Sequence, residues 1–218
     1  MSVSLLNHSW YSLLQGVSSP ELLISVASHL GYKSIALTDT NNLLGAVAFH
    51  EFSLKQGIKP ILGSVLRTST QSVVALIENR VGYRNLCCIL SRLNLNVDAN
   101  LGELLLQFNQ GLHLLVDNPG FLELLHPFYA SRVWAGLNRS GRSRSVSSHQ
   151  RKLLECADRL GVLPVALHGC YFAQPGFLEL YRVVRAIREC TLLQRLKDDH
   201  VGPDNYLLPL NEFHELFR

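Results

Sequence analysis

The sequence predicts an α/β fold, and within that class a β/α barrel of about seven strands. Three observations support this prediction. About seven short apolar runs occur along the chain, and each is followed by a helix or a partial helix. The stretch 30–66 reads as a complete strand–helix–strand unit, which implies a parallel strand pair. No hairpin signal marks an edge strand, which favours a barrel, although an open doubly wound sheet is also compatible with the pattern.

The stretch 30–66 is the best-defined part of the predicted fold. We expect it to contain, in order, a strand, a polar turn, a helix and a second strand: Ser34–Leu37, Thr38–Asn42, Leu43–Gln56 and Lys59–Leu62. Gly57 separates the helix from the second strand. Because chemistry in β/α barrels occurs at the carboxyl ends of the strands, Asp39 lies at a functional position.

The remaining elements follow from apolar runs and helix boundary signals. Ser19 as a cap, Pro20 at the first helical position and Gly31 after the last one define a helix over Pro20–Leu30. The other expected strands are Val3–Leu6, Ser72–Ile77, Leu112–Val116, Val133–Leu137 and Val162–Leu167. The other expected helices are Gly82–Leu93, Leu101–Phe108, Phe121–Leu125, His149–Leu160, Pro175–Cys190 and Leu210–Phe217.

Composition restricts the class of protein. The chain has 218 residues, of which 47% are hydrophobic, enough for one large domain with a substantial core. It has no uncharged apolar run of about eighteen residues, and its start lacks the pattern of a signal peptide, so we expect a cytoplasmic protein without a membrane span. The five cysteines form no CxxC pair and suit reduced thiols. A net charge of +3 is weak for a nucleic-acid-binding domain.

A basic, serine-rich stretch interrupts the pattern at 138–148, with the sequence NRSGRSRSVSS. It contains Arg139, Arg142 and Arg144 and has no strong apolar pattern. We interpret it as a solvated loop. A loop whose arginines contact nucleic-acid phosphates is the alternative.

Several segments resemble a known family. ALTDTNNLLGAVAFHEFSLKQGIKPILG at 36–63, preceded by HSWYSLLQGVSSPELLISVASHLGYKSI, is similar to the PHP (polymerase and histidinol phosphatase) domain. ALIENRVGYRNLCCILSRLN, LGVLPVALHGCYFAQPGFLELYRVVRAIRECTLL and NYLLPLNEFHELF resemble more narrowly the N-terminal PHP domain of bacterial C-family DNA polymerases, the polymerase III alpha subunit and its error-prone relative. The resemblance implies one distorted seven-stranded β/α barrel of PHP type over 1–218, in which 191–218 resembles a connection toward a polymerase palm.

Active members of that family hold several divalent metals with His, Asp, Glu and Cys ligands at the strand ends, a donor set suited to Zn, Mn or Fe. Here only His8 and Asp39 match ligand positions. Other ligand positions fall on residues that lack such donors: Leu6, Thr40, Val65 and Ser72. Later positions fall at 116–118, at Arg139-Ser140 and at 169–171. Two ligands cannot hold a metal cluster, so we expect no metal and no catalytic residue, with His168 and Cys170 as conceivable substitutes.

The residual candidates also have structural interpretations. We expect His8 to make a structural hydrogen bond rather than to act as an orphan ligand or general base. Asp39 is expected to bond loop amides at the head of the following helix. Four aromatic residues could form a base-stacking platform, but core packing is favoured: Trp10, Tyr11, Phe49 and Phe52.

The sequence is compatible with two functions. The first is a catalytically degenerate PHP domain of, or associated with, a C-family DNA polymerase in replication or error-prone repair synthesis. Its partners would be the polymerase palm and thumb, in cis or in trans, or a proofreading exonuclease, with DNA bound only indirectly and no membrane contact. The alternative is a phosphoesterase or 3′–5′ exonuclease that depends on Zn, Mn or Mg. In the first case the chain alone is not an enzyme, although the parent polymerase is.

Overall fold

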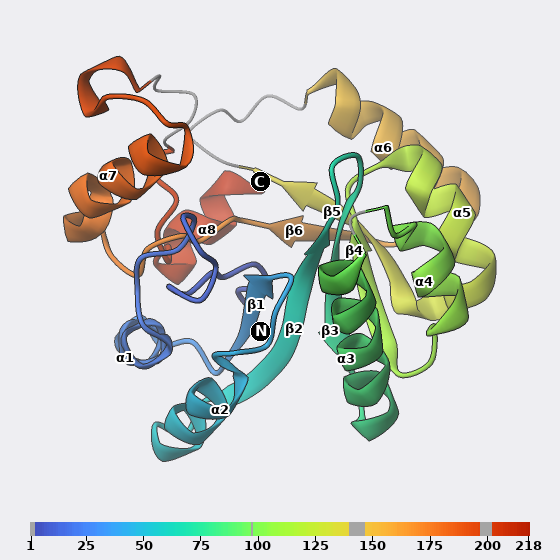
Figure 1. The fold of residues 1–218 in the computed structure, drawn as a ribbon, viewed down its shortest axis with the longest axis horizontal. Helices are drawn as coiled ribbons and strands as arrows, with labels where there is room; N and C mark the ends of the chain where they lie inside the picture. Colours follow the sequence, from blue (N-terminus) through green and yellow to red (C-terminus); the bar gives the residue numbers. More distant parts are fainter. Residues whose placement is uncertain (1–2, 97, 140–146, 197–201) are drawn as a thin grey trace. The chain divides into compact units, whose positions relative to one another are not determined.

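The computed structural model describes residues 3–96, 98–139, 147–196 and 202–218 (Figure 1). The chain divides into two compact units. Unit 1 comprises 1–62, 139–144 and 167–218, and unit 2 comprises 63–138 and 145–166. Arg142 and Arg144, two of the predicted phosphate contacts, lie outside the described residues. In the described ranges, no helix combines the length and the apolar character that a membrane span requires.

The predicted α/β class is confirmed. The described residues contain six named strands, hydrogen-bonded to one another in chain order: β1 (Ser34–Thr40), β2 (Lys59–Arg67), β3 (Ser72–Ile77), β4 (Leu112–Val116), β5 (Val133–Asn138) and β6 (Pro164–Leu167). β2 begins in unit 1 and continues into unit 2, because the division falls between Leu62 and Gly63.

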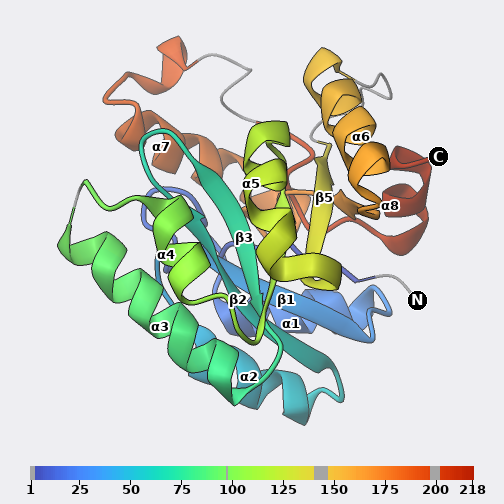
Figure 2. The same cartoon turned by 90° about the vertical axis from the view of Figure 1, so that its right-hand side faces the viewer.

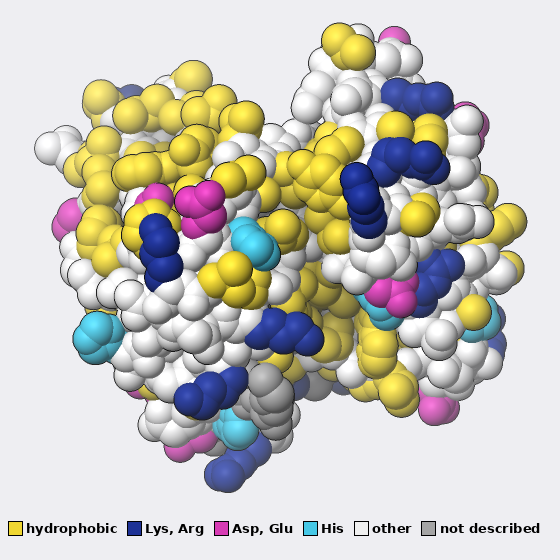
Figure 3. All heavy atoms as spheres, turned by 90° about the horizontal axis from the view of Figure 1, so that it is seen from below, with side chains coloured by type: hydrophobic (Ala, Val, Ile, Leu, Met, Phe, Trp, Pro, Cys, Tyr) yellow, Lys and Arg dark blue, Asp and Glu magenta, His cyan; other side chains and the backbone are white. Residues whose placement is uncertain are grey.

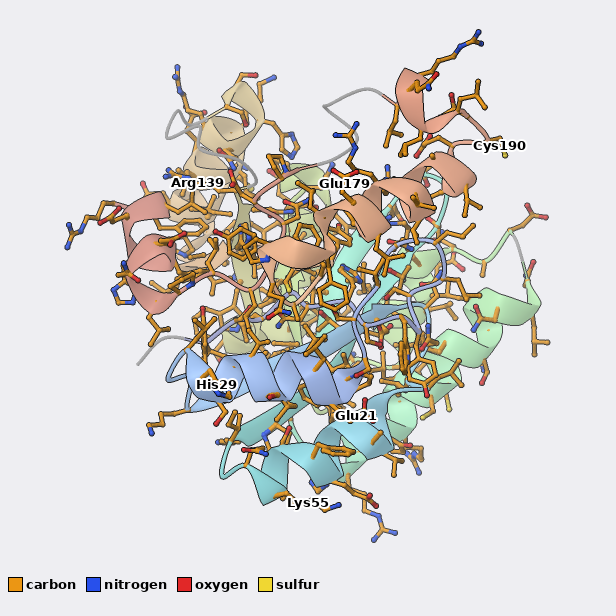
Figure 4. The ribbon with its side chains drawn as sticks, turned by 90° about the vertical axis from the view of Figure 1, so that its left-hand side faces the viewer. Glu21, His29, Lys55, Arg139, Glu179 and Cys190 are labelled. Atoms are coloured by element: carbon orange, nitrogen blue, oxygen red, sulfur yellow. The ribbon has the colours of Figure 1, made fainter. Side chains whose placement is uncertain are left out.

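Unit 1 contains β1 and four helices: α1 (Pro20–His29), α2 (Ala46–Lys55), α7 (Leu178–Arg188) and α8 (Leu210–Leu216). The Ser19 hydroxyl caps α1 at the Leu22 amide, as expected from the sequence. α1 packs against α2, as Figure 4 shows, with Lys55 labelled at the end of α2. The same view labels Glu179 in the first turn of α7 and Cys190 just beyond its last residue. Buried side chains from α1, β1 and α2, with Cys170, Ala173 and Leu207, form the core of this unit.

The predicted first strand, Val3–Leu6, is present only as isolated bridges. Ser4 pairs with Ile35 and Asn7 pairs with Cys170. Backbone bonds extend these contacts on both sides, from Ala36 N to Ser4 O and from Cys170 N to Leu6 O. The first segment therefore lies between β1 and the chain around Cys170, with too few consecutive bonds to form a regular ladder.

Unit 2 contains β3, β4, β5 and the second half of β2. Its helices are α3 (Arg80–Leu95), α4 (Leu101–Gln107), α5 (Pro119–Tyr129) and α6 (Ser148–Leu160) (Figure 2). α3 packs on β3 and β4, and α5 packs on β4 and β5. β4 pairs with β5 in parallel, with Leu114 opposite Val133. α3, α5 and α6 thus pack on the strands that they follow or precede, and α4 packs on α5 and α3.

The sequence showed no hairpin signal, and the expectation of a fold without a hairpin is wrong. β2 and β3 form an antiparallel hairpin in which Gly63 pairs with Leu76 and Arg67 with Ser72, and β3 is also antiparallel to β4. The turn covers 68–71 and is closed by the bond from Thr68 N to Gln71 O. The Thr68 hydroxyl accepts bonds from the Thr70 and Gln71 amides. Hydroxyl side chains take the place of the Asn-Gly or Gly-containing turn that ordinarily signals a hairpin.

Candidate functional site

Asp39 is the hydrogen-bonding centre of the polar cluster in unit 1. It is buried near the carboxyl end of β1, which extends through Thr40, so the predicted turn at Thr38–Asn42 begins later than expected. One carboxylate oxygen accepts the Ser9 amide at 2.7 Å and the Ser12 hydroxyl at 2.6 Å. The other accepts the Ser9 hydroxyl at 2.7 Å. These short bonds to a buried carboxylate hold the chain after the first segment against β1.

The bonds from Ser9 and Ser12 differ from the predicted bonds to loop amides at the head of the following helix. Ser9 and Ser12 precede Asp39 by 30 and 27 residues, and the cap role of Asp39 stays a prediction. The residue before α2, Gly45, makes no side-chain cap bond, and Asn42 accepts the Leu44 amide instead. Sequence reasoning missed Ser9 and Ser12, because a polar run after an apolar segment does not reveal which distant carboxylate it contacts.

His8 extends the same network. Its Nδ1 lies 3.1 Å from the Ser12 hydroxyl, and its ring stacks on Tyr171 with centroids 4.6 Å apart. The single proton of the Ser12 hydroxyl is donated to Asp39, so Nδ1 of His8 must carry the proton that it shares with Ser12. The structural role predicted for His8 agrees with these contacts.

The network does not have the geometry of a nucleophilic triad. In such a triad the imidazole lies between the nucleophile and the carboxylate, whereas here Ser12 lies between His8 and Asp39. All three side chains are buried. Burial raises the pKa of Asp39 above its ordinary value, and the bonds from Ser12 and Ser9 oppose that increase. The cluster is therefore buried, and its bonds join the 9–16 loop to the end of β1.

Neighbouring positions of the predicted ligand set also have structural contacts. The Asn7 amide donates to the carbonyls of Ser4 and Ala36 at 3.1 and 2.8 Å, and its oxygen accepts the Ser4 hydroxyl. Thr40, one of the predicted ligand positions, donates its hydroxyl to Gln15 Oε1. Val65, another predicted ligand position, is a buried strand residue paired with Val74. These residues hold the fold together and supply no anionic oxygen.

His168 and Cys170 do not fit the role of substitute ligands. Nδ1 of His168 lies 3.0 Å from the Arg139 carbonyl, and Nε2 lies 2.8 Å from the Asp204 carbonyl. Both ring nitrogens face backbone carbonyl oxygens, so neither points toward a group of metal ligands. The Cys170 thiol is fully buried, contacts the Phe172 carbonyl, and has its pKa raised by burial to about 12. It is a neutral thiol at physiological pH.

Arg139 is the described member of the predicted phosphate-binding arginines. Its guanidinium donates to the Leu216 carbonyl and lies 5.3 Å from the centroid of the Phe217 ring. These contacts bind it to the end of α8. The phosphate-contacting role of the 138–148 loop stays a prediction.

Aromatic packing differs from the expectation at two positions. Phe49 is fully buried in the core of unit 1 as predicted, but Trp10 and Phe52 are exposed. Tyr11 lies edge-on to Trp10, and the bond from Asn42 Nδ2 to the Tyr11 carbonyl fixes its backbone. Trp10 therefore belongs to the surface.

Unit 2 has a pocket of about 700 Å³ beside the β2–β3 turn. Three elements line it, namely this turn, the start of α5 and the start of α6, through Arg67, Thr68, Ser69, Thr70, Gln71, Ser72, Asp117, Asn118, Gly120, Phe121, Leu124 and His149. The His149 Nε2 donates to the Asp117 carbonyl at 2.7 Å. Burial raises the pKa of Asp117, while His149 and Arg67 counteract the increase. Two basic side chains and several hydroxyls make this pocket compatible with an anion.

A metal cluster does not fit the residues that the structure describes. Nowhere in the described ranges do three His, Cys, Asp or Glu side chains come together in a group able to hold a metal ion. In the pocket of unit 2, Asp117 is the single carboxylate, and Arg67 lies close enough to affect its charge. A dinuclear or trinuclear centre needs several anionic ligands, which these side chains do not supply.

The described strands thus form one six-stranded sheet, with a polar cluster near the end of β1 and a hydroxyl-lined pocket beside the β2–β3 turn. The sequence profile of one protein family, the PHP domain, matches residues 4–158. The chain belongs to the PHP domain family, as its sequence resemblance predicted.

Curated relatives agree with the narrower resemblance. DNA polymerase III subunit alpha of Bacillus subtilis is 27% identical over 234 residues, which cover 97% of this chain and 21% of that protein. The same subunit of Escherichia coli is 26% identical over 240 residues and covers 96% of this chain. An error-prone DNA polymerase of Hahella chejuensis is 29% identical over 229 residues. The chain spans about a fifth of the length of these relatives.

Solved structures share the fold. An amidohydrolase of Chromobacterium violaceum, with bound sulfate and no metal, aligns with a TM-score of 0.51 and 15% identity over 99% of this chain and 97% of its own. A two-domain Bacteroides vulgatus protein that contains a predicted PHP-like metal-dependent phosphoesterase aligns with a TM-score of 0.50 and 14% identity, over 78% of this chain and 52% of its own. At these identities the similarity establishes the fold alone.

Proposed function

We propose that this chain is a catalytically degenerate PHP domain of, or associated with, a bacterial C-family DNA polymerase, and that it acts as a structural and protein-interaction module. One observation carries the proposal: Asp39, a surviving ligand-position carboxylate, is buried and bonded to Ser9 and Ser12. The Ser9 amide and the hydroxyls of Ser9 and Ser12 engage both oxygens of this carboxylate, which supports a role in holding the loop. The relatives, which are about five times as long, support a polymerase context.

The first test concerns metal. The purified chain should contain less than stoichiometric Zn, Mn and Mg by elemental analysis. It should also show no metal-stimulated hydrolysis of a chromogenic phosphodiester or of single-stranded DNA. A stoichiometric metal that survives dialysis, with hydrolysis that disappears in Asp39→Ala, would contradict the degenerate state.

The second test concerns interaction. The chain should bind the part of a DNA polymerase III alpha subunit from the same organism that lies beyond the PHP region, measured by isothermal titration calorimetry with both proteins purified. A polymerase segment that is folded and active but does not bind would contradict the module role.

A phosphoesterase or 3′–5′ exonuclease is the second candidate function, and the pocket of unit 2 is the observation in its favour. Arg67, His149 and the hydroxyls of the β2–β3 turn offer donors to a phosphate group. This function predicts Mn-dependent hydrolysis that falls at least tenfold in both Arg67→Ala and His149→Ala. Arg84→Ala, on the exposed surface of α3, is the matched control. Equal, metal-independent background rates in all four proteins would exclude it.

A further inference from the structure

Exposed hydrophobic side chains gather on parts of the molecular surface, as the yellow areas of Figure 3 show for one face. One group in unit 1 comes from two segments, the loop 9–16 and the start of α2. It consists of Trp10, Leu13, Leu14, Leu44 and Val47, here named the loop–α2 patch, and each member is between 44% and 81% exposed. A single exposed hydrophobic side chain is ordinary, but five in two touching segments indicate an interaction surface.

The loop that carries three of these side chains has a fixed conformation. The amide of Trp10 donates to the Ser18 carbonyl at 2.9 Å, and the amides of Gln15 and Gly16 both donate to the Ser12 carbonyl. Leu14 has a φ of 56°, in the left-handed region that bulky residues rarely adopt. Such strain persists only where surrounding contacts enforce it, and it is common at functional surfaces.

The two segments are also joined to each other. Asn42 Nδ2 donates to the Tyr11 carbonyl at 3.0 Å and to the Thr40 carbonyl at 2.9 Å. The Tyr11 ring lies so close to Gly45 that a Cβ on Gly45 would be 2.9 Å from it. Beneath the loop, Asp39 holds Ser9 and Ser12. The patch is therefore preorganised, which lowers the entropy cost of binding a partner.

The lack of charged residues in the loop–α2 patch restricts the kinds of partner that it can bind. The stretches 9–16 and 40–49 contain no Lys, Arg, His, Asp or Glu. Nucleic acids and anionic membrane surfaces are bound through cationic side chains, which both segments lack. An uncharged apolar patch that includes a tryptophan matches the buried centre of a protein–protein interface.

We propose that the loop–α2 patch docks onto an uncharged apolar surface of the polymerase segment of a C-family DNA polymerase, and that Asp39 positions the loop for this contact. The inference rests on the proposed function and names the face that the interaction uses. The length of the relatives supports this choice of partner, since about four-fifths of each relative lies beyond the region that this chain matches. A carboxylate at a metal-ligand position thereby serves recognition in place of catalysis.

The test uses the full chain and the purified polymerase segment described above, with the dissociation constant as the readout. Leu13→Ser and Leu44→Ser should each weaken binding by about tenfold or more. Leu95→Ser and Leu163→Ser, equally exposed leucines of unit 2, are the matched controls and should change it by less than about twofold. Circular dichroism and thermal unfolding confirm that each variant is folded.

The outcomes separate this inference from the proposed function. If the wild-type chain does not bind the segment, the proposed function fails. If the wild type binds and both patch variants bind equally well, the function stands and the patch assignment is overturned. Patch-dependent self-association in sedimentation, or patch-dependent binding to neutral phosphatidylcholine vesicles without any effect on segment binding, also overturns it.

Discussion

The hydroxyl of Ser12 donates to the carboxylate of Asp39 at 2.6 Å, although 27 residues separate them. This bond joins the loop after the first segment to the end of β1 and lies beneath the loop–α2 patch. The same hydroxyl accepts the Thr40 amide at 3.0 Å and contacts His8. Ser12 thus links Asp39, Thr40 and His8 in one hydrogen-bond network.

Removing the Asp39 acceptor should destabilise the protein. In Asp39→Ala the Ser9 amide and the hydroxyls of Ser9 and Ser12 lose a buried acceptor, and each unsatisfied donor is costly. We expect a loss of roughly 2–4 kcal/mol in the free energy of unfolding, measured by urea denaturation. Asp98→Ala, at an exposed position, is the control and should change it by less than about 0.5 kcal/mol.

Asp39 should also give the stability a characteristic pH dependence. Its pKa is raised in the folded state, so the folded protein binds more protons than the unfolded chain between the ordinary carboxyl value and the folded value. The contribution of Asp39 is therefore most favourable below about pH 4 and is lost as the pH rises through its folded pKa.

The direction of this pH dependence can be measured by comparing the free energy of unfolding of the wild type with that of Asp39→Asn across pH 4 to 7. The stability of the wild type relative to Asp39→Asn should fall as the pH rises and then become constant. A difference that moves in favour of the wild type would mean that the serine bonds outweigh burial and depress the pKa.

The cysteines should differ sharply in reactivity. Burial raises the pKa of Cys170 to about 12, whereas Cys190 is exposed. Because the thiolate is the reactive form, iodoacetamide at pH 8 should modify Cys190 and leave Cys170 unmodified in the native protein. Peptide mass spectrometry distinguishes the two, and modification of both in urea is the control. Rapid native labelling of Cys170 would contradict its buried, protonated state.

Gly45 should not tolerate a side chain. A Cβ there would meet the Tyr11 ring at 2.9 Å, the Leu37 side chain at 3.1 Å and an Asp39 oxygen at 3.3 Å. Gly45→Ala should therefore lower the free energy of unfolding by about 1–3 kcal/mol through overpacking. Gly176→Ala, where no atom lies within 4 Å of the added Cβ, is the matched control and should leave the midpoint of urea unfolding nearly unchanged.

Much of the secondary structure could be predicted because its signals are local. β3 over Ser72–Ile77 and β4 over Leu112–Val116 have the bounds expected from their apolar runs. The start of α1 follows from Ser19 and Pro20. The family also follows from contiguous segments, since the PHP match over 4–158 depends on residue order along the chain.

Tertiary structure alone decided the pairing of strands and the partners of Asp39. The antiparallel β2–β3 hairpin and the bonds from Ser9 and Ser12 to Asp39 depend on which distant residues meet in space. Periodicity reports which face of an element is buried, but a carboxylate can be satisfied equally well by a nearby amide or by a remote hydroxyl. The sequence by itself therefore determined the fold class and the family, while long-range hydrogen bonding decided which distant residues bond to the carboxylate of Asp39.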